Sequence, residues 1–191
     1  MSGREARRTV LRQLDEATLV MLSSAGEKDA YEEIVRRRQA DLRRMLYRLC
    51  ADRALADDLA QDAFVKGWRN LSRLHSHAHF GAWLRQIAVN TWVDRVRGAK
   101  LRTEPLHSDE ALAVTSGGGP SWSEARMDVH AALARLSPAE RSCIILSYWE
   151  GMSHPEIAAM TRMAVGTVKS HLFRAGPKLR QQLKAWRYVD D

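Results

Sequence analysis

The stretch HPEIAAMTRMAVGTVKSHLFR, His154 to Arg174, contains a short helical pattern, a break and a second helical pattern. Apolar side chains of the second pattern recur every three or four residues and predict a helix with one buried stripe, packed on Ile157 and Met160: Val165, Val168, Leu172, Ala175, Leu179 and Leu183. Its other face carries Thr167, Ser170, His171, Arg174 and Lys178. A helix that enters a DNA groove needs such a face, but a helical hairpin with a polar outer surface has it too. The stretch predicts two packed helices and leaves both functions open.

Helix-start signals surround this stretch. Ser137-Pro138-Ala139-Glu140 and Ser153-His154-Pro155-Glu156 both fit the capping box, with Pro in the first turn where its missing N–H costs little. Each signal marks the start of a helix. Gly151 is therefore expected in a tight turn between two helices.

The rest of the chain shows helical spacing and no apolar–polar alternation typical of strands. We predict an all-α protein with helices at about 15–24, 28–50, 53–72, 80–98, 123–136, 138–149, 154–160 and 165–184. Residues 101–121, with Pro105 and the run Gly117-Gly118-Gly119-Pro120, break the periodicity and predict a flexible linker. As a coil its ends would lie on the order of 25 Å apart. Two small domains, 14–100 and 123–187, would then flank a linker at 101–122 and move independently.

The charge balance favours a polyanionic partner. The 191 residues include 30 Lys and Arg against 23 Asp and Glu, and residues 162–187 contain seven basic residues and no acidic one. Nucleic acid is the first candidate and an anionic membrane surface the second, although a basic run can also be a solvated face. No apolar run is long enough for a membrane span and no signal peptide is evident, so we expect a cytosolic protein. Cys50 and Cys143 lack the spacing of a zinc site.

The stretch DDLAQDAFVKGW, Asp57 to Trp68, predicts a second kind of surface. Its helix would bury a stripe made of Ala60, Phe64, Trp68 and Leu71. Asp58, Leu59 and Asp62 would emerge on the other side, and an acidic surface with an apolar residue suits protein docking. The alternative is a divalent-metal site, which the lack of a nearby His and the presence of Lys66 and Arg69 disfavour.

The stretch FGAWLRQIAVNTWVDRVRGAK, Phe80 to Lys100, combines arginines with tryptophans. Phe80, Trp83, Leu84, Ile87 and Thr91 would form the buried stripe. Arg85, Trp92, Arg95 and Arg97 would project around it, and exposed Arg beside Trp suits single-stranded DNA. For Trp92, burial in the core is an equally good interpretation.

The order of AYEEIVRRR, DDLAQDAFVKGW, FGAWLRQIAVNTWVDRVR, a variable linker and LSPAERSCIILSYWEGMSHPEIAAMTRMAVGTVKSHLFRA resembles the extracytoplasmic-function sigma factors of bacterial RNA polymerase. The resemblance covers about Leu14 to Leu183. It implies a region 2 that docks on polymerase and opens the minus-ten promoter element, and a region 4 that recognises the minus-thirty-five element. It also implies core polymerase and promoter DNA as partners, an anti-sigma factor, no cofactor, no metal and no catalytic activity.

The resemblance assigns roles to individual positions. Polymerase docking falls to Asp58, Leu59, Gln61 and Asp62. The segment Arg73 to His79, with His75, His77 and His79, matches the loop that captures an unstacked base, and Asn90, Asp94, Arg95 and Arg97 match the helix that follows the opened strand. Minus-thirty-five recognition falls to Thr167, Lys169, Ser170, His171 and Arg174. With the residues singled out by pattern, the minus-ten set gains Trp92 and the minus-thirty-five set gains Arg162 and Lys178.

Two features depart from the family. Arg162 and Ala164 stand where Gly and a capping Ser are common, so we expect a positive φ on a non-glycine residue and a missing N-cap worth about 0.5–2 kcal/mol. Gly176-Pro177 predicts a kink or break in the last helix, because Pro177 cannot donate to the Phe173 carbonyl. The three loop histidines could also form a metal site or pH sensor.

Two rival functions stay open at this point. A stand-alone helix-turn-helix regulator would bind duplex DNA tightly without polymerase, but it would leave the acidic stretch Asp57 to Trp68 without a purpose. A DNA-cutting or DNA-joining enzyme would need an activated nucleophile or a carboxylate cluster, and the sequence offers neither.

Overall fold

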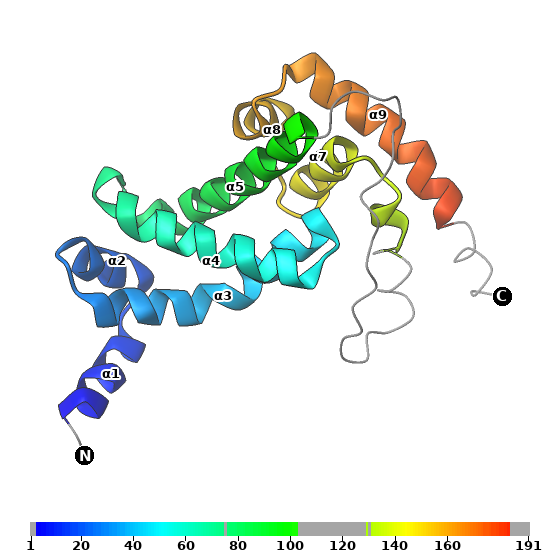
Figure 1. Ribbon diagram of the computed structural model, residues 1–191. Helices are drawn as coiled ribbons and strands as arrows, with labels where there is room; N and C mark the ends of the chain where they lie inside the picture. Colours follow the sequence, from blue (N-terminus) through cyan, green and yellow to red (C-terminus); the bar gives the residue numbers. More distant parts are fainter. Residues whose placement is uncertain (1–2, 75, 103–128, 130, 184–191) are drawn as a thin grey trace.

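The computed structural model describes residues 3–74, 76–102, 129 and 131–183, and every regular element in that part of the chain is a helix. The elements are α1 (Gly3–Gln13), α2 (Glu16–Ser24), α3 (Lys28–Cys50), α4 (Arg53–Asn70), the 3-10 turns η1 (Leu71–Arg73) and η2 (His77–His79), α5 (Phe80–Arg102), α7 (Pro138–Tyr148), α8 (His154–Thr161) and α9 (Val165–Gln182). Figure 1 shows them in chain order. The predicted all-α fold is confirmed. The predicted linker beyond Arg102, which ends α5, and half of the predicted helix at 123–136 lie outside the described residues.

The first group of helices is built around α3, which packs against α2, α4 and α5. Local signals set its helix boundaries. The Asp15 carboxylate accepts from the Thr18 N–H at 2.9 Å to start α2, and Asp52 accepts from Leu55 at 3.0 Å to start α4. Between α3 and α4 the chain turns at Ala51, a non-glycine residue with φ +57°. Two long helices thus lie side by side along one shared face.

Helix α1 was not predicted from the sequence. Its apolar content is low, and of its two adjacent apolar residues Leu11 is buried whereas Val10 is 57% exposed. Polar contacts hold it to α3: Arg7 pairs with Glu27, and the Arg37 guanidinium donates to the carbonyls of Leu11 and Leu14 at 3.1 and 2.8 Å. Periodicity misses α1 because long-range hydrogen bonds replace most of the apolar stripe.

The second group contains α7, α8 and α9. Both predicted capping boxes are present, at Ser137/Glu140 and Ser153/Glu156, and Gly151 has φ +66° in the turn between α7 and α8. α9 runs through Pro177, so of the predicted kink or break the break is wrong, and the kink stays a prediction. Pro177 is exposed and removes one backbone hydrogen bond near the exposed Phe173, a loss that the remaining bonds of the helix tolerate.

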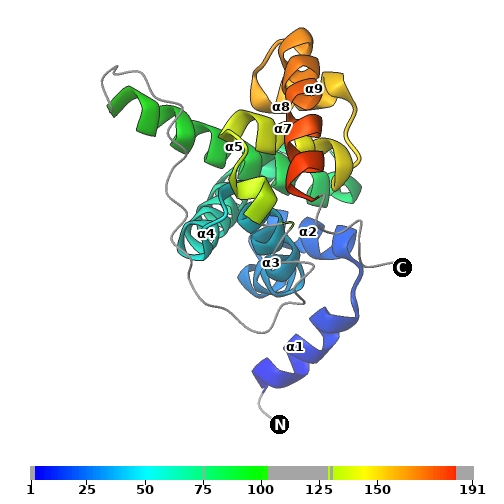
Figure 2. The ribbon, with the colours of Figure 1, turned by 90° about the vertical axis from the view of Figure 1, so that its right-hand side faces the viewer.

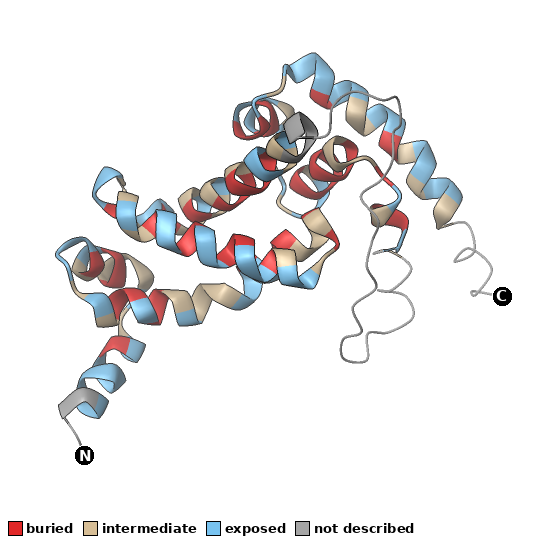
Figure 3. Cartoon of the chain, in the orientation of Figure 1, coloured by how far each residue is buried: buried red, intermediate tan, exposed pale blue. Residues whose placement is uncertain are grey.

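The two groups pack against each other. α7 contacts α3 and α8 contacts α5, and the apolar core is continuous from Leu46 and Leu84 to Leu146 and Ile157. Figure 2, turned from the first view, shows α7, α8 and α9 stacked against the α3–α5 layer, and Figure 3 shows buried residues on the facing sides. In this structure the two groups share an apolar interface that the sequence did not predict, and their independent movement stays a prediction.

Candidate functional sites

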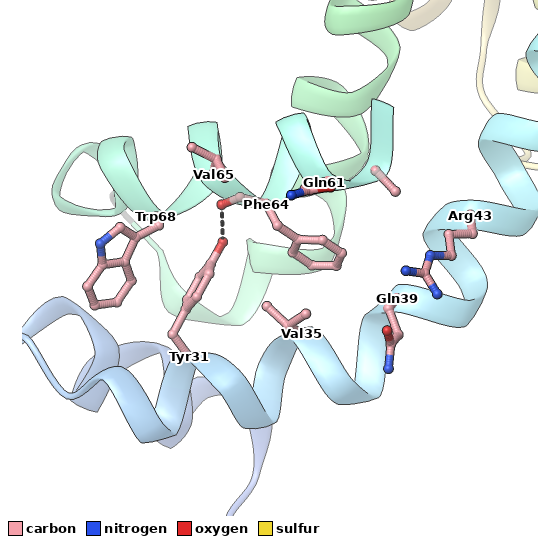
Figure 4. Close-up of a pocket in the computed structure, with 9 residues that line it drawn as sticks. Tyr31, Val35, Gln39, Arg43, Gln61, Phe64, Val65 and Trp68 are labelled. Carbon is pink, nitrogen blue, oxygen red and sulfur yellow. Dashed lines mark hydrogen bonds between the residues drawn. The ribbon is translucent and has the colours of Figure 1, made fainter. Parts of the chain in front are cut away.

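An apolar groove of about 370 Å3 lies between α3 and α4. Figure 4 shows side chains from both helices converging on it. α3 contributes Tyr31, Val35, Gln39 and Arg43, and α4 contributes Ala60, Gln61, Phe64, Val65 and Trp68. Only part of the α4 side was predicted from the sequence. The α3 lining was missed because no local pattern on α3 reveals which face α4 leaves uncovered.

The floor of the groove is rigid. The Tyr31 hydroxyl donates to the Phe64 carbonyl at 2.6 Å, and the Tyr31 and Trp68 rings lie 4.9 Å apart. Burial raises the pKa of Tyr31, so the hydroxyl stays protonated and keeps donating. A Cβ on Gly67 would stand 2.9 Å from the Tyr31 hydroxyl oxygen, so the close approach of α3 and α4 requires glycine there.

Exposed polar and acidic residues border this groove on α4. Asp58 and Asp62 are exposed, as predicted, and Gln61 is exposed as well. Leu59 is fully buried, so its predicted place on the outer surface is wrong. α4 packs against both α3 and α5, and this widens its buried arc beyond one stripe. The apolar part of this surface comes instead from the groove and from Val65, which is 43% exposed.

Two of the three predicted histidines lie in the described part of the loop before α5. His77 is half-buried and His79 is exposed, with its Nδ1 2.9 Å from the Ser76 hydroxyl. His75 lies outside the described residues. Among the residues that are described, no group of three or more His, Cys, Asp or Glu is arranged to hold a metal ion. The hypothesis of a three-histidine metal or pH site stays a prediction.

α5 presents fewer candidate residues than its sequence suggests. Asn90 is half-buried and Arg95 is exposed. Trp92 is only 3% exposed and belongs to the core, so its predicted exposure for base stacking is wrong. α5 packs against α3, α4 and α8, which leaves only a narrow outer face. The exposed Arg97 is directed to α8, where its Nη2 lies 3.3 Å from the Thr161 carbonyl oxygen.

The outer face of α9 carries the basic and polar side chains that were predicted. Thr167, Lys169, Ser170 and Arg174 are exposed on its first turns, and the Arg174 Nε donates to the Ser170 carbonyl at 3.2 Å. The stripe that faces inward centres on the buried Val168 and Ala175. The described part of α9 therefore offers a cationic surface without any carboxylate.

Two predicted members of this face, Lys178 and His171, also contact the interior of the protein. Lys178 donates to both carboxylate oxygens of Glu140 at 2.9 and 3.0 Å, tying α9 to α7. His171 is half-buried, and its Nδ1 is buried with no hydrogen-bond partner. Burial, and then the charge of Arg174, lowers the pKa of His171 and favours the neutral ring. These two residues position α9 as well as lining its surface.

The turn before α9 has the geometry that its unusual sequence predicts. Arg162 closes α8 with φ +56°, in the left-handed region, and Ala164 starts α9 with no side-chain cap. Both helices nevertheless form, because Met160 and Val168 are buried on either side of the turn. Packing thus supports the turn into α9, which lacks a side-chain N-cap.

Comparison with known proteins identifies the family to which this chain belongs. The Sigma-70 region 2 family model matches residues 34–102, and the Sigma-70 region 4 model matches residues 126–175. The RNA polymerase sigma-E factor of Streptomyces avermitilis is 35% identical over 84% of this chain and 88% of its own length. The chain belongs to the extracytoplasmic-function sigma factors. A further member, the SigE sigma factor of Mycolicibacterium smegmatis, is 30% identical over 88% of this chain and 69% of its own length.

Solved structures agree with this family. CnrH in complex with the cytosolic domain of CnrY has a TM-score of 0.57 at 27% identity and covers 89% of this chain and 97% of that one. The sigma factor RpoE of Bartonella quintana, in complex with the anti-sigma factor NepR, has a TM-score of 0.59 at 28% identity and covers 84% and 98%. In this sigma factor, most of α3 and all of α4 and α5 fall in the region 2 match, and α7, α8 and the first part of α9 fall in the region 4 match. Over the described helices, none has the length and apolarity needed to cross a membrane.

Proposed function

We propose that this sigma factor directs core RNA polymerase to promoters through three surfaces with separate tasks. The α3–α4 groove with Asp58, Gln61 and Asp62 docks on polymerase. The loop from Arg73 to His79 and the outer face of α5 bind the opened minus-ten strand. The first turns of α9 bind the minus-thirty-five duplex.

The observation that carries this proposal is the separation of charge between α4 and α9. The α4 surface has exposed carboxylates beside an apolar groove, which suits a protein and repels DNA phosphates. The exposed face of α9 is cationic and polar, which suits phosphates and base edges. A chain that only bound DNA would gain nothing from the α4 surface.

The burial of Trp92 changes how the minus-ten strand would be held. Without that ring, α5 offers the Arg95 and Arg97 guanidinium groups and the half-buried Asn90 amide. Arginine binds backbone phosphates and can stack on bases, and an amide can bond to a base edge. Base capture then falls to the loop with His77 and His79, whose rings can stack or donate hydrogen bonds.

An anti-sigma factor is a further expected partner. The two solved relatives are described in complexes, CnrH with CnrY and RpoE with NepR. The groove between α3 and α4 is an open apolar surface that a helix of such a partner could cover, in competition with polymerase. We assign this chain no catalytic role, since RNA synthesis belongs to the polymerase.

Transcription from genomic DNA with bacterial core polymerase, with and without this protein, tests the proposal. We expect new transcripts that start at a shared promoter pattern only when the protein is present. A protein that binds promoter duplex tightly alone and adds no transcripts would be a stand-alone helix-turn-helix regulator instead.

A further inference from the structure

The seam between the two domains has an apolar centre and charged edges. At its centre, α7 packs on α3 and α8 packs on α5 within one continuous core. At one edge, Arg85 of α5 lies 3.5 Å from Glu150, and the Arg48 guanidinium lies 5.8 Å from the centre of the Trp149 ring. The opposite edge joins α5 to the turn of the helix-turn-helix.

That second edge consists of residues with candidate DNA-binding roles. The Arg162 Nη1 lies 3.1 Å from the Asp94 Oδ1 on α5. In the reverse direction, the Arg97 Nη2 of α5 lies 3.3 and 3.5 Å from the carbonyl oxygens of Thr161 and Arg162, at the C-terminal end of α8. A cation there is favoured by the helix dipole. Arg162 thus reaches from the helix-turn-helix to α5, and Arg97 reaches from α5 to the end of α8.

Arg162 has a backbone conformation that is unusual for a residue with a long side chain. A left-handed φ of +56° disfavours a long side chain, and glycine would fit the same backbone without strain. The backbone conformation at this position therefore does not favour arginine. The observed gain is the contact with Asp94, which glycine would lose.

We propose that Arg162 and Asp94, with Arg97, form a latch that holds the helix-turn-helix domain closed on α5 in the free protein. The functional consequence rests on the proposed function. A closed latch occupies Arg97, assigned to the minus-ten strand, and Arg162, assigned to the minus-thirty-five duplex. Opening releases both, so promoter binding and domain separation are coupled.

Cys50 can report on opening of the seam. It ends α3 close to Arg141, which is buried on α7, and burial raises the pKa of Cys50 to about 11. Its reaction with a thiol reagent is therefore slow in the closed form. When reclosing is faster than labelling, the labelling rate follows the population of the open form. Peptide mass spectrometry separates Cys50 from Cys143 without any substitution.

The test uses charge reversal in the full-length protein. Arg162→Asp and Asp94→Arg should each raise the Cys50 labelling rate about two- to fivefold, the range expected for a partly exposed ion pair. The double variant should return to the parent rate, because the pair is restored with its charges exchanged. Arg162→Gly should label faster as well, but its thermal midpoint should not fall, since glycine relieves the left-handed strain.

Arg180→Ala, which removes an exposed arginine from α9, is the matched control and should label at the parent rate. Single variants that label like the parent, or a double variant as fast as the singles, would refute the latch. If Arg162→Gly labels faster only together with a lower thermal midpoint, local unfolding replaces the latch as the explanation. If the parent protein supports transcription but the variants do not change Cys50 labelling, only the latch is refuted. If the variants change Cys50 labelling but the parent supports no transcription, the proposed function is refuted instead.

Discussion

α4 and α9 are both eighteen residues long, and they are used in opposite ways. α4 buries six residues between α3 and α5 and exposes three carboxylates, Asp57, Asp58 and Asp62, together with basic residues nearer its ends. α9 buries only Val168 and Ala175 and leaves most of its surface to solvent. The comparison shows how one all-helical chain separates two partners: the enclosed helix offers a fixed groove to a protein, and the peripheral helix offers a free face to DNA.

The burial of Leu59 gives the largest expected effect. Leu59→Ala should lower the free energy of unfolding by about 2–5 kcal/mol, because it leaves a cavity in the region 2 core. Urea denaturation measures this loss. Val65→Ala on the same helix is the matched control, and its exposed side chain should cost less than about 1 kcal/mol. Equal costs would mean that α4 is not enclosed as described.

Charge reversal at the edge of the groove tests the acidic surface. Asp62→Arg should weaken binding to core polymerase by more than about tenfold, since a like charge replaces an attractive one at an interface. Competition for core polymerase against the parent gives the ratio. Glu32→Arg, an exposed acidic position that pairs with Arg8 of α1, should compete as the parent does. Full competition by Asp62→Arg would place the docking surface elsewhere.

On α9, Arg174→Ala should lower promoter use by about 1–3 kcal/mol and change the preference at one base pair. Transcription from a library of minus-thirty-five sequences measures both effects. Lys169→Ala should instead weaken all sequences evenly and reduce the slope of binding against salt by about 1. An even loss for Arg174→Ala would reassign that side chain to a phosphate.

The smallest effect concerns the link that holds α9 to α7. Burial acts to raise the pKa of Glu140, but hydrogen bonds from Lys178 and Ser137 outweigh it and the pKa falls below 4.5. The folded pKa is the lower one, so the stabilisation is present above pH 4.5 and disappears as pH falls through the folded value. Lys178→Met should cost less than about 1 kcal/mol at pH 7, with the difference from the parent shrinking in acid. A difference that is constant with pH in urea titrations would argue against the ion pair.

Local signals in the sequence predicted most helix boundaries, because caps and turns act over a few residues. The predicted limits of α3 match the structure, and both capping boxes are present. Exposure was predicted less well. Leu59 and Trp92 lie on helices that are packed by two or three neighbours, and a single-stripe pattern underestimates how much such helices bury.

The packing between domains was beyond the reach of periodicity. It depends on residues distant in sequence, such as Arg162 and Asp94, whose pairing no local spacing indicates. The groove presents the same difficulty, since Val35 and Gln39 line it only because α4 crosses α3 there. The role of Arg97 at the end of α8 likewise follows from tertiary contacts.

The most direct test of the division between α4 and α9 is promoter binding and opening on one promoter, by gel shift and permanganate footprint, each with and without core polymerase. We expect weak, unselective binding by the free protein. With polymerase we expect specific binding and reactive thymines in the minus-ten element. Tight, specific binding by the free protein, or specific binding by the complex with no reactive thymines, would contradict this expectation.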